Sequence, residues 1–166
     1  MFKVLILVFI TVISRLIPHL PNFSPLIAVA LFSGVYFKNK FSFIIPLSIY
    51  VVSDLILGIS DMAIFCWGSI VIIHFLGVLL RKRLSFGNTF LFSLLSSSLF
   101  FLITNFGVWL VGWYPPTLEG FLQCYLMALP FFRISLLSTL FYVGILFGGY
   151  QYFLKLKDKT IFSLQE

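Results

Sequence analysis

Residues 15–25 read Arg15-Leu16-Ile17-Pro18-His19-Leu20-Pro21-Asn22-Phe23-Ser24-Pro25. This segment interrupts apolar sequence with three prolines, a cation, an imidazole and an amide. A polar cluster between two apolar runs is either a helix connector at a membrane surface or the wall of a binding site. Both interpretations require apolar helices on either side of it.

The composition is that of an integral membrane protein. Of the 166 residues, 61% are hydrophobic and only 10% are charged, and the mean hydropathy is +1.13, which is outside the range of soluble domains. Polar residues gather in short patches between apolar runs, as expected for helices that satisfy their own backbone hydrogen bonds in hydrocarbon. The sequence therefore predicts an all-α, polytopic membrane protein with a single domain over residues 1–166.

Six transmembrane helices are expected, at about 4–17, 25–37, 41–58, 62–80, 89–111 and 131–154, together with an interfacial helix at about 117–129. Ser24 is suited to cap the second helix and Pro25 to occupy its first position. Thr117 is suited to cap the interfacial helix, and Glu119 lies in the first turn of that helix. The first apolar run lacks an Ala-x-Ala cleavage site, which favours a retained helix over a signal peptide.

The cations test this helix count. Six helices place the two termini and the second and fourth connectors on one side, and nine of the eleven cations fall there: Lys3, Lys38, Lys40, Arg81, Lys82, Arg83, Lys155, Lys157 and Lys159. Because lysine and arginine favour the cytoplasmic side, both termini are predicted to be cytoplasmic. The predicted location is the bacterial cytoplasmic (inner) membrane, with multiple passes. The net charge of +6 then reflects membrane topology, and no nucleic-acid partner is expected.

The predicted outer face collects most of the unusual side chains. A guanidinium at a helix end costs a few kcal/mol unless it is paired or reaches water, so Arg15 and Arg133 either pair with Asp54 and Asp61 or bind an anionic or carbonyl-bearing ligand. Both alternatives stay open at this point. The candidate ligand-binding residues are Arg15, His19, Asn22, Asp54, Asn105, Trp109, Tyr114 and Arg133.

An enzyme is not expected. The sequence contains no nucleophile–base pair, no His-x-x-x-His or Glu-x-x-His spacing and no glycine-rich phosphate loop, and no metal or cofactor is predicted. His74 lies deep in the fourth predicted helix, where an interhelical hydrogen bond is the expected role. Cys66 and Cys124 have no metal-binding spacing, and whether they pair depends on the side of the membrane that each faces.

Three motifs carry a resemblance to known proteins: the segment from Arg15 to Pro25, Asp54-x-x-x-Gly58 and Thr104-Asn105-Phe106-Gly107-Val108-Trp109. They resemble those of a family of small, functionally unassigned bacterial membrane proteins. In helix pattern the chain also resembles the S-components, the substrate-binding subunits of energy-coupling factor (ECF) vitamin transporters. This second resemblance implies a vitamin-like ligand in a cavity near the outer surface, walled by residues 14–24, 54–66 and 105–133.

The resemblance to S-components has one departure. Their Ala-x-x-x-Ala pattern on the first helix, which packs on the coupling subunit, is absent here, because residues 4–13 contain no alanine. A partnership with an ECF-type coupling module is therefore in doubt, and a solitary mode of action stays open. Some solitary S-components bind cobalamin through a cysteine, and Cys66 would act as a metal ligand only in that case.

The leading hypothesis is a membrane protein that binds a small organic micronutrient from the outer side and moves it inward. The alternative is a structural or assembly subunit of the cell envelope, similar in length and helix number to the rod-shape protein MreD, with no small-molecule ligand.

Overall fold

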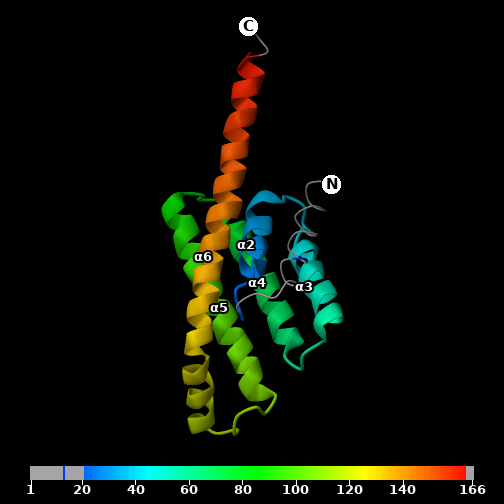
Figure 1. Cartoon of the computed structure of the whole chain (residues 1–166), viewed down its shortest axis with the longest axis vertical. Helices are drawn as coiled ribbons and strands as arrows, with labels where there is room; N and C mark the ends of the chain where they lie inside the picture. Colours follow the sequence, from blue (N-terminus) through cyan, green and yellow to red (C-terminus); the bar gives the residue numbers. More distant parts are fainter. Residues whose placement is uncertain (1–12, 14–20, 164–166) are drawn as a thin grey trace.

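The computed structural model describes residue 13 and residues 21–163, with side chains up to residue 155. The described part contains five helices: α2 (Leu26–Tyr36), α3 (Ile44–Leu57), α4 (Ala63–Arg81), α5 (Phe86–Leu110) and α6 (Leu118–Ser163). They form an all-helical bundle whose longest member, α6, extends well beyond the others toward the C-terminus (Figure 1). The predicted helix over residues 4–17 lies outside the described residues, apart from Ile13.

Three of these helices are long and apolar enough to cross a membrane: Ala63–Arg81, Phe86–Leu110 and Leu118–Lys155. Large apolar side chains are also widely exposed on the bundle surface, for example Ile64, Leu110 and Leu137. A water-soluble bundle would expose fewer such side chains in a continuous surface. The fold is therefore that of a membrane protein, whereas six spans and cytoplasmic termini stay predictions.

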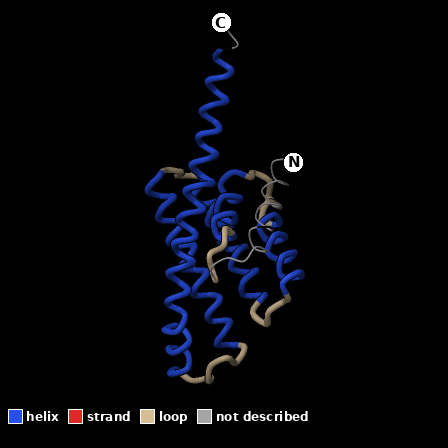
Figure 2. Tube along the Cα trace, in the orientation of Figure 1, coloured by secondary structure: helices blue, strands red, loops and turns tan. Residues whose placement is uncertain are grey.

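Helix α2 occupies the centre of the bundle. All residues from Leu26 to Val35 are buried, so the helix is apolar on every side, as expected for a helix enclosed by others. With 11 residues, α2 is about 16 Å long, whereas α4, with 19 residues, is about 28 Å long. Figure 2 shows that α2 accordingly starts from a loop at mid-height in the bundle rather than at the end of the bundle.

Helices α2 and α4 touch through their backbones at two glycines. A Cβ atom on Gly34 would lie 2.0 Å from the carbonyl oxygen of His74, and one on Gly77 would lie 2.2 Å from the carbonyl oxygen of Leu31. Close approach of this kind is characteristic of small residues at membrane helix interfaces. The crossing of α2 and α4 therefore depends on the absence of side chains at both positions.

His74 is 2% exposed beside this crossing and has the interhelical role that its sequence position suggests. Its Nδ1 lies 2.8 Å from the hydroxyl oxygen of Ser33 on α2, and its Nε2 lies 3.3 Å from that of Ser42 in the α2–α3 connector. Both ring nitrogens thus have partners, which is the usual condition for a buried polar group.

The C-terminal end of α2 is capped by a cation. The guanidinium of Arg81, at the end of α4, donates to the backbone carbonyls of Gly34 and Phe37. The carbonyl of Gly34 belongs to the last turn of α2, where carbonyls lack partners within the helix, and Phe37 is the residue directly after the helix. A positive charge at this end also complements the helix dipole.

The structure corrects two predicted boundaries. Helix α5 starts at Phe86 rather than near Thr89, because the hydroxyl of Ser85 accepts from the backbone N–H of Asn88 and caps the helix earlier. The predicted interfacial helix over 117–129 and the predicted spanning helix over 131–154 form one continuous helix, α6, with Pro130 inside it.

Packing explains why Pro130 does not end α6. A proline removes one backbone hydrogen bond and disfavours the helix interior, but neighbouring helices often keep such helices intact in membrane proteins. Here Phe101 of α5 packs against rings on both sides of the proline, with centroids 5.6 Å from Tyr125 and 4.8 Å from Phe132. These contacts of Phe101 on both sides of Pro130 support α6 as one continuous helix.

Candidate ligand-binding cavity

A cavity of about 390 Å³ lies between the start of α2 and the loop that joins α5 to α6. It occupies the part of the bundle that α2 is too short to fill. Its described walls come from α3, α4, α5, α6, the segment before α2 and the α5–α6 loop. The lining residues are Asn22, Tyr50, Met62, Cys66, Phe100, Phe101, Thr104, Asn105, Val108, Trp113, Tyr114, Cys124, Ala128, Phe131, Phe132 and Ser135.

The segment before α2 forms the inner end of the cavity. Asn22 has a left-handed backbone, with φ of 64°, a conformation that asparagine adopts more readily than most residues. The ring of Phe23 packs against Tyr142 of α6 at a centroid distance of 5.6 Å, and the hydroxyl of Ser138 donates to the carbonyl of Ser24 at 2.9 Å. These contacts fix the segment to α6 and hold Asn22 at the cavity.

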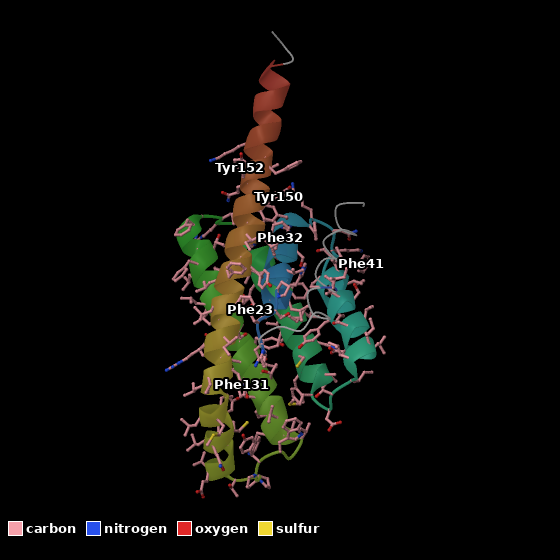
Figure 3. The ribbon with its side chains drawn as sticks, in the orientation of Figure 1. Phe23, Phe32, Phe41, Phe131, Tyr150 and Tyr152 are labelled. Carbon is pink, nitrogen blue, oxygen red and sulfur yellow. The ribbon has the colours of Figure 1, made fainter. Side chains whose placement is uncertain are left out.

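Aromatic residues follow α6 from the cavity to the far end of the bundle. Figure 3 shows Phe131 nearest the α5–α6 loop, then Phe23 at mid-height, then Phe32 with Tyr150. Phe131 lines the cavity, whereas Phe32 and Tyr150 pack against each other at a centroid distance of 5.7 Å. The aromatic side chains therefore form a cavity wall in one half of the bundle and a packed core in the other.

Helix α5 contributes the polar wall. The hydroxyl of Thr104 donates to the carbonyl of Phe100, and Nδ2 of Asn105 donates to the carbonyl of Phe101, each at 2.8 Å. Both side chains thereby bond the preceding turn of their own helix. Because only the NH₂ group of Asn105 can donate to a carbonyl, this bond fixes the orientation of the amide. Its Oδ1 has no hydrogen-bond partner among the described residues.

The α5–α6 loop lies at the end of the cavity away from α2. The indole of Trp109 donates to the carbonyl of Pro115 at 3.0 Å, and the hydroxyl of Thr117 accepts from the backbone N–H of Gly120 at 3.1 Å, which caps α6. A Cβ atom at Gly120 would lie 2.2 Å from the carbonyl oxygen of Pro115. These contacts fold the loop back on the first turn of α6 and bring Trp113 and Tyr114 to the cavity.

Three of the residues predicted from sequence line this cavity: Asn22, Asn105 and Tyr114. Trp109 positions the loop instead. Arg133 is exposed on α6 and is not among the lining residues. Arg15 and His19 lie outside the described residues, so their predicted roles are untested.

Asp54 is also absent from the lining residues. It is 8% exposed on α3, and a carboxylate oxygen accepts from the indole N–H of Trp67 at 2.8 Å. Asp61, in the α3–α4 connector, is exposed. Asp54 therefore links α3 to α4 through the Trp67 indole.

Sequence reasoning singled out none of the apolar wall residues Tyr50, Phe100, Phe101, Phe131 and Phe132, because nothing in an apolar run distinguishes a cavity from a packed interface. Ser135 was also not predicted. Cys66 and Cys124 both line the cavity; they fall in residues 54–66 and 105–133, which the resemblance to S-components implied as walls, and Cys66 was named there as a ligand only for a cobalamin. Cys124 is buried, and its thiol donates to the carbonyl of Asn105 at 3.4 Å, so the motif around Asn105 and the start of α6 are joined directly. Both cysteines are free thiols.

The described lining residues carry no formal charge. They offer amide, hydroxyl and thiol groups against a background of aromatic rings, which suits binding of a small organic molecule better than acid–base chemistry. The arrangement therefore supports recognition of a partly polar ligand.

Residues 1–161 match the model of a family described as "Family of unknown function (DUF6580)". The chain belongs to this family. No curated protein and no solved structure matches it. The DUF6580 assignment agrees with the resemblance to a functionally unassigned family, while the ligand and role of this chain must be argued from the cavity itself.

Proposed function

We propose that this protein binds a small, partly polar organic molecule of the micronutrient type and takes part in its uptake across the bacterial cytoplasmic membrane. The observation that carries the proposal is the cavity of about 390 Å³ beyond the start of α2. Pockets of this size are typical of small-molecule sites. Helices that begin inside a membrane protein also commonly border substrate sites near the middle of the bilayer.

The direction of binding rests on charge. Lys38, Lys40 and residues 81–83 belong to the two connectors at the end of the bundle opposite the α5–α6 loop. Since cationic connectors favour the cytoplasmic side, the α5–α6 loop and the cavity next to it face outward in the proposed topology, with six spans and both termini in the cytoplasm. Arg15 and His19 are proposed to contribute to the same site.

The cavity wall supports binding rather than catalysis, so we propose no enzymatic activity. An S-component-like role in vitamin uptake is part of the proposal, whether alone or with a coupling module. The first-helix pattern that would favour an ECF-type coupling module is absent from the sequence.

Native mass spectrometry of the purified protein tests the proposal. The wild-type protein is expected to retain an organic molecule other than lipid or detergent. Ala128→Phe, which fills the cavity, should abolish this retention. The matched control is Leu126→Phe, because Leu126 is 63% exposed on the same helix, and this variant should behave like the wild type.

Two results would contradict the proposal. One is a protein that is empty in repeated preparations and whose gene deletion leaves the uptake of every vitamin unchanged. The other is a deletion that alters cell shape or envelope assembly without affecting nutrient uptake, which would favour the structural role.

A further inference from the structure

Asn105 presents a donor and an acceptor to the cavity. Its NH₂ group has two hydrogens, and the bond to the carbonyl of Phe101 at 2.8 Å uses one of them. The other N–H and Oδ1 remain, and no described protein group bonds Oδ1. An amide with both groups available can bind a ring edge that carries an acceptor next to a donor, as asparagine does with nucleobases.

The aromatic rings of the wall favour a flat ligand. Phe101 and Phe132 lie 4.8 Å apart between centroids, and both border the cavity on facing helices. Phe131 and Tyr114 add further ring surface. Rings of this kind make their best contacts with another planar ring, either stacked or edge to face.

The volume of the cavity limits the size of the ligand. Water occupies about 30 Å³ per molecule in the liquid, so a cavity of about 390 Å³ has room for roughly thirteen. A molecule with on the order of a dozen non-hydrogen atoms, such as a bicyclic ring system, fits this space.

Building on the proposed binding function, we infer that the ligand is a planar heterocycle of about this size. A hydrogen-bond acceptor and donor on adjacent positions of its ring edge meet the N–H and Oδ1 of Asn105, and the rings of α5 and α6 hold its faces.

Two probes test this inference: pterin, which has such an edge, and quinoxaline, a bicycle of similar shape without a donor. The dissociation constant of each is obtained from the rise of the unfolding temperature with probe concentration in detergent. Pterin is expected to bind at least about tenfold more tightly than quinoxaline, the difference made by one or two hydrogen bonds.

The variant Asn105→Leu, similar in size but without the amide, should weaken pterin binding about tenfold and change quinoxaline binding less than about twofold. Asn88→Leu, on the same helix but away from the cavity, should change neither constant. If Asn105→Leu does not fold, the comparison of the two probes on the wild-type protein still decides the inference.

The outcomes separate the inference from the proposed function. Quinoxaline binding as tightly as pterin would overturn the inference, as would retention of an acyclic molecule by the purified protein. A protein that retains no organic molecule and binds neither probe would overturn the proposed function as well.

Discussion

The contact between α2 and α4 gives the most quantitative prediction, tested with Gly77→Ala. A Cβ atom at this position would lie 2.2 Å from the carbonyl oxygen of Leu31 and 2.9 Å from the Cα of Gly34. Carbon–oxygen contacts between helices are normally about 3.3 Å or longer, so the two helices must move apart by about 1 Å. Because both contacts are with backbone atoms, rotation of a side chain cannot relieve them.

The expected loss follows from two opposing terms. Overpacking a tight interface costs about 3 kcal/mol, and exchanging glycine for alanine within a helix returns about 1 kcal/mol of helix propensity. Gly77→Ala should therefore lower the free energy of unfolding by about 2 kcal/mol. The matched control is Gly68→Ala on the same helix, where a Cβ atom meets nothing within 4 Å, and this variant should be unchanged or more stable by up to about 1 kcal/mol.

Equilibrium unfolding in mixed micelles of increasing sodium dodecyl sulfate content, followed by far-ultraviolet circular dichroism, measures both variants. The difference between them isolates the contact, because the propensity term is common to both. In the double variant with Gly34→Ala, the two losses should sum to less than their separate values, since one separation of the helices relieves both contacts. Equal stability of Gly77→Ala and Gly68→Ala would refute the packing described for α2 and α4.

Three further predictions concern buried polar contacts, and the same unfolding assay measures each. His74→Ala removes the imidazole's bonds to α2 and to the α2–α3 connector and should cost about 1–3 kcal/mol, whereas His74→Asn, which can replace the Nδ1 contact, should recover part of the loss. Equal losses in the two variants would count against the contact at Nδ1. Arg81→Met uncaps α2 and should cost about 1–2 kcal/mol, while Arg83→Met, at an exposed position, should change stability by less than about 0.5 kcal/mol. Asp54→Leu leaves its indole partner without an acceptor and should cost at least about 1 kcal/mol, with Asp61→Leu in the exposed connector as the nearly neutral control; a loss at Asp61 as large as at Asp54 would contradict the assigned contact.

The sequence predicts α2, α3 and α4 to within three residues at each end, because polar or charged residues mark their connectors. Lys38, Asn39 and Lys40 end α2, and Ser60 and Asp61 separate α3 from α4. The prediction is wrong at Pro130, where a local rule about proline suggests a helix end. The continuity of α6 depends on Phe101, a residue of another helix, and single-sequence patterns contain no information about that contact.

The polar part of the cavity was easier to predict than its apolar part for a physical reason. An amide in an apolar segment must find a partner, so Asn22 and Asn105 are conspicuous in the sequence. The chain has 22 phenylalanines, and a phenylalanine in a membrane protein can face lipid, a helix or a cavity at similar cost. Only the arrangement of the helices distinguishes Phe131, at the cavity, from Phe32, in the packed core.

The size of the cavity can be related to the length of α2. Among the described residues, α2 with its 11 residues is about 12 Å shorter than α4. A column of this height and about 10 Å in diameter, the width of one helix, has a volume of about 900 Å³. The cavity of about 390 Å³ is less than half of this volume. Because Pro25 comes directly before the first residue of α2, the point where this helix begins limits the depth of the cavity, and the segment with Asn22 closes that end.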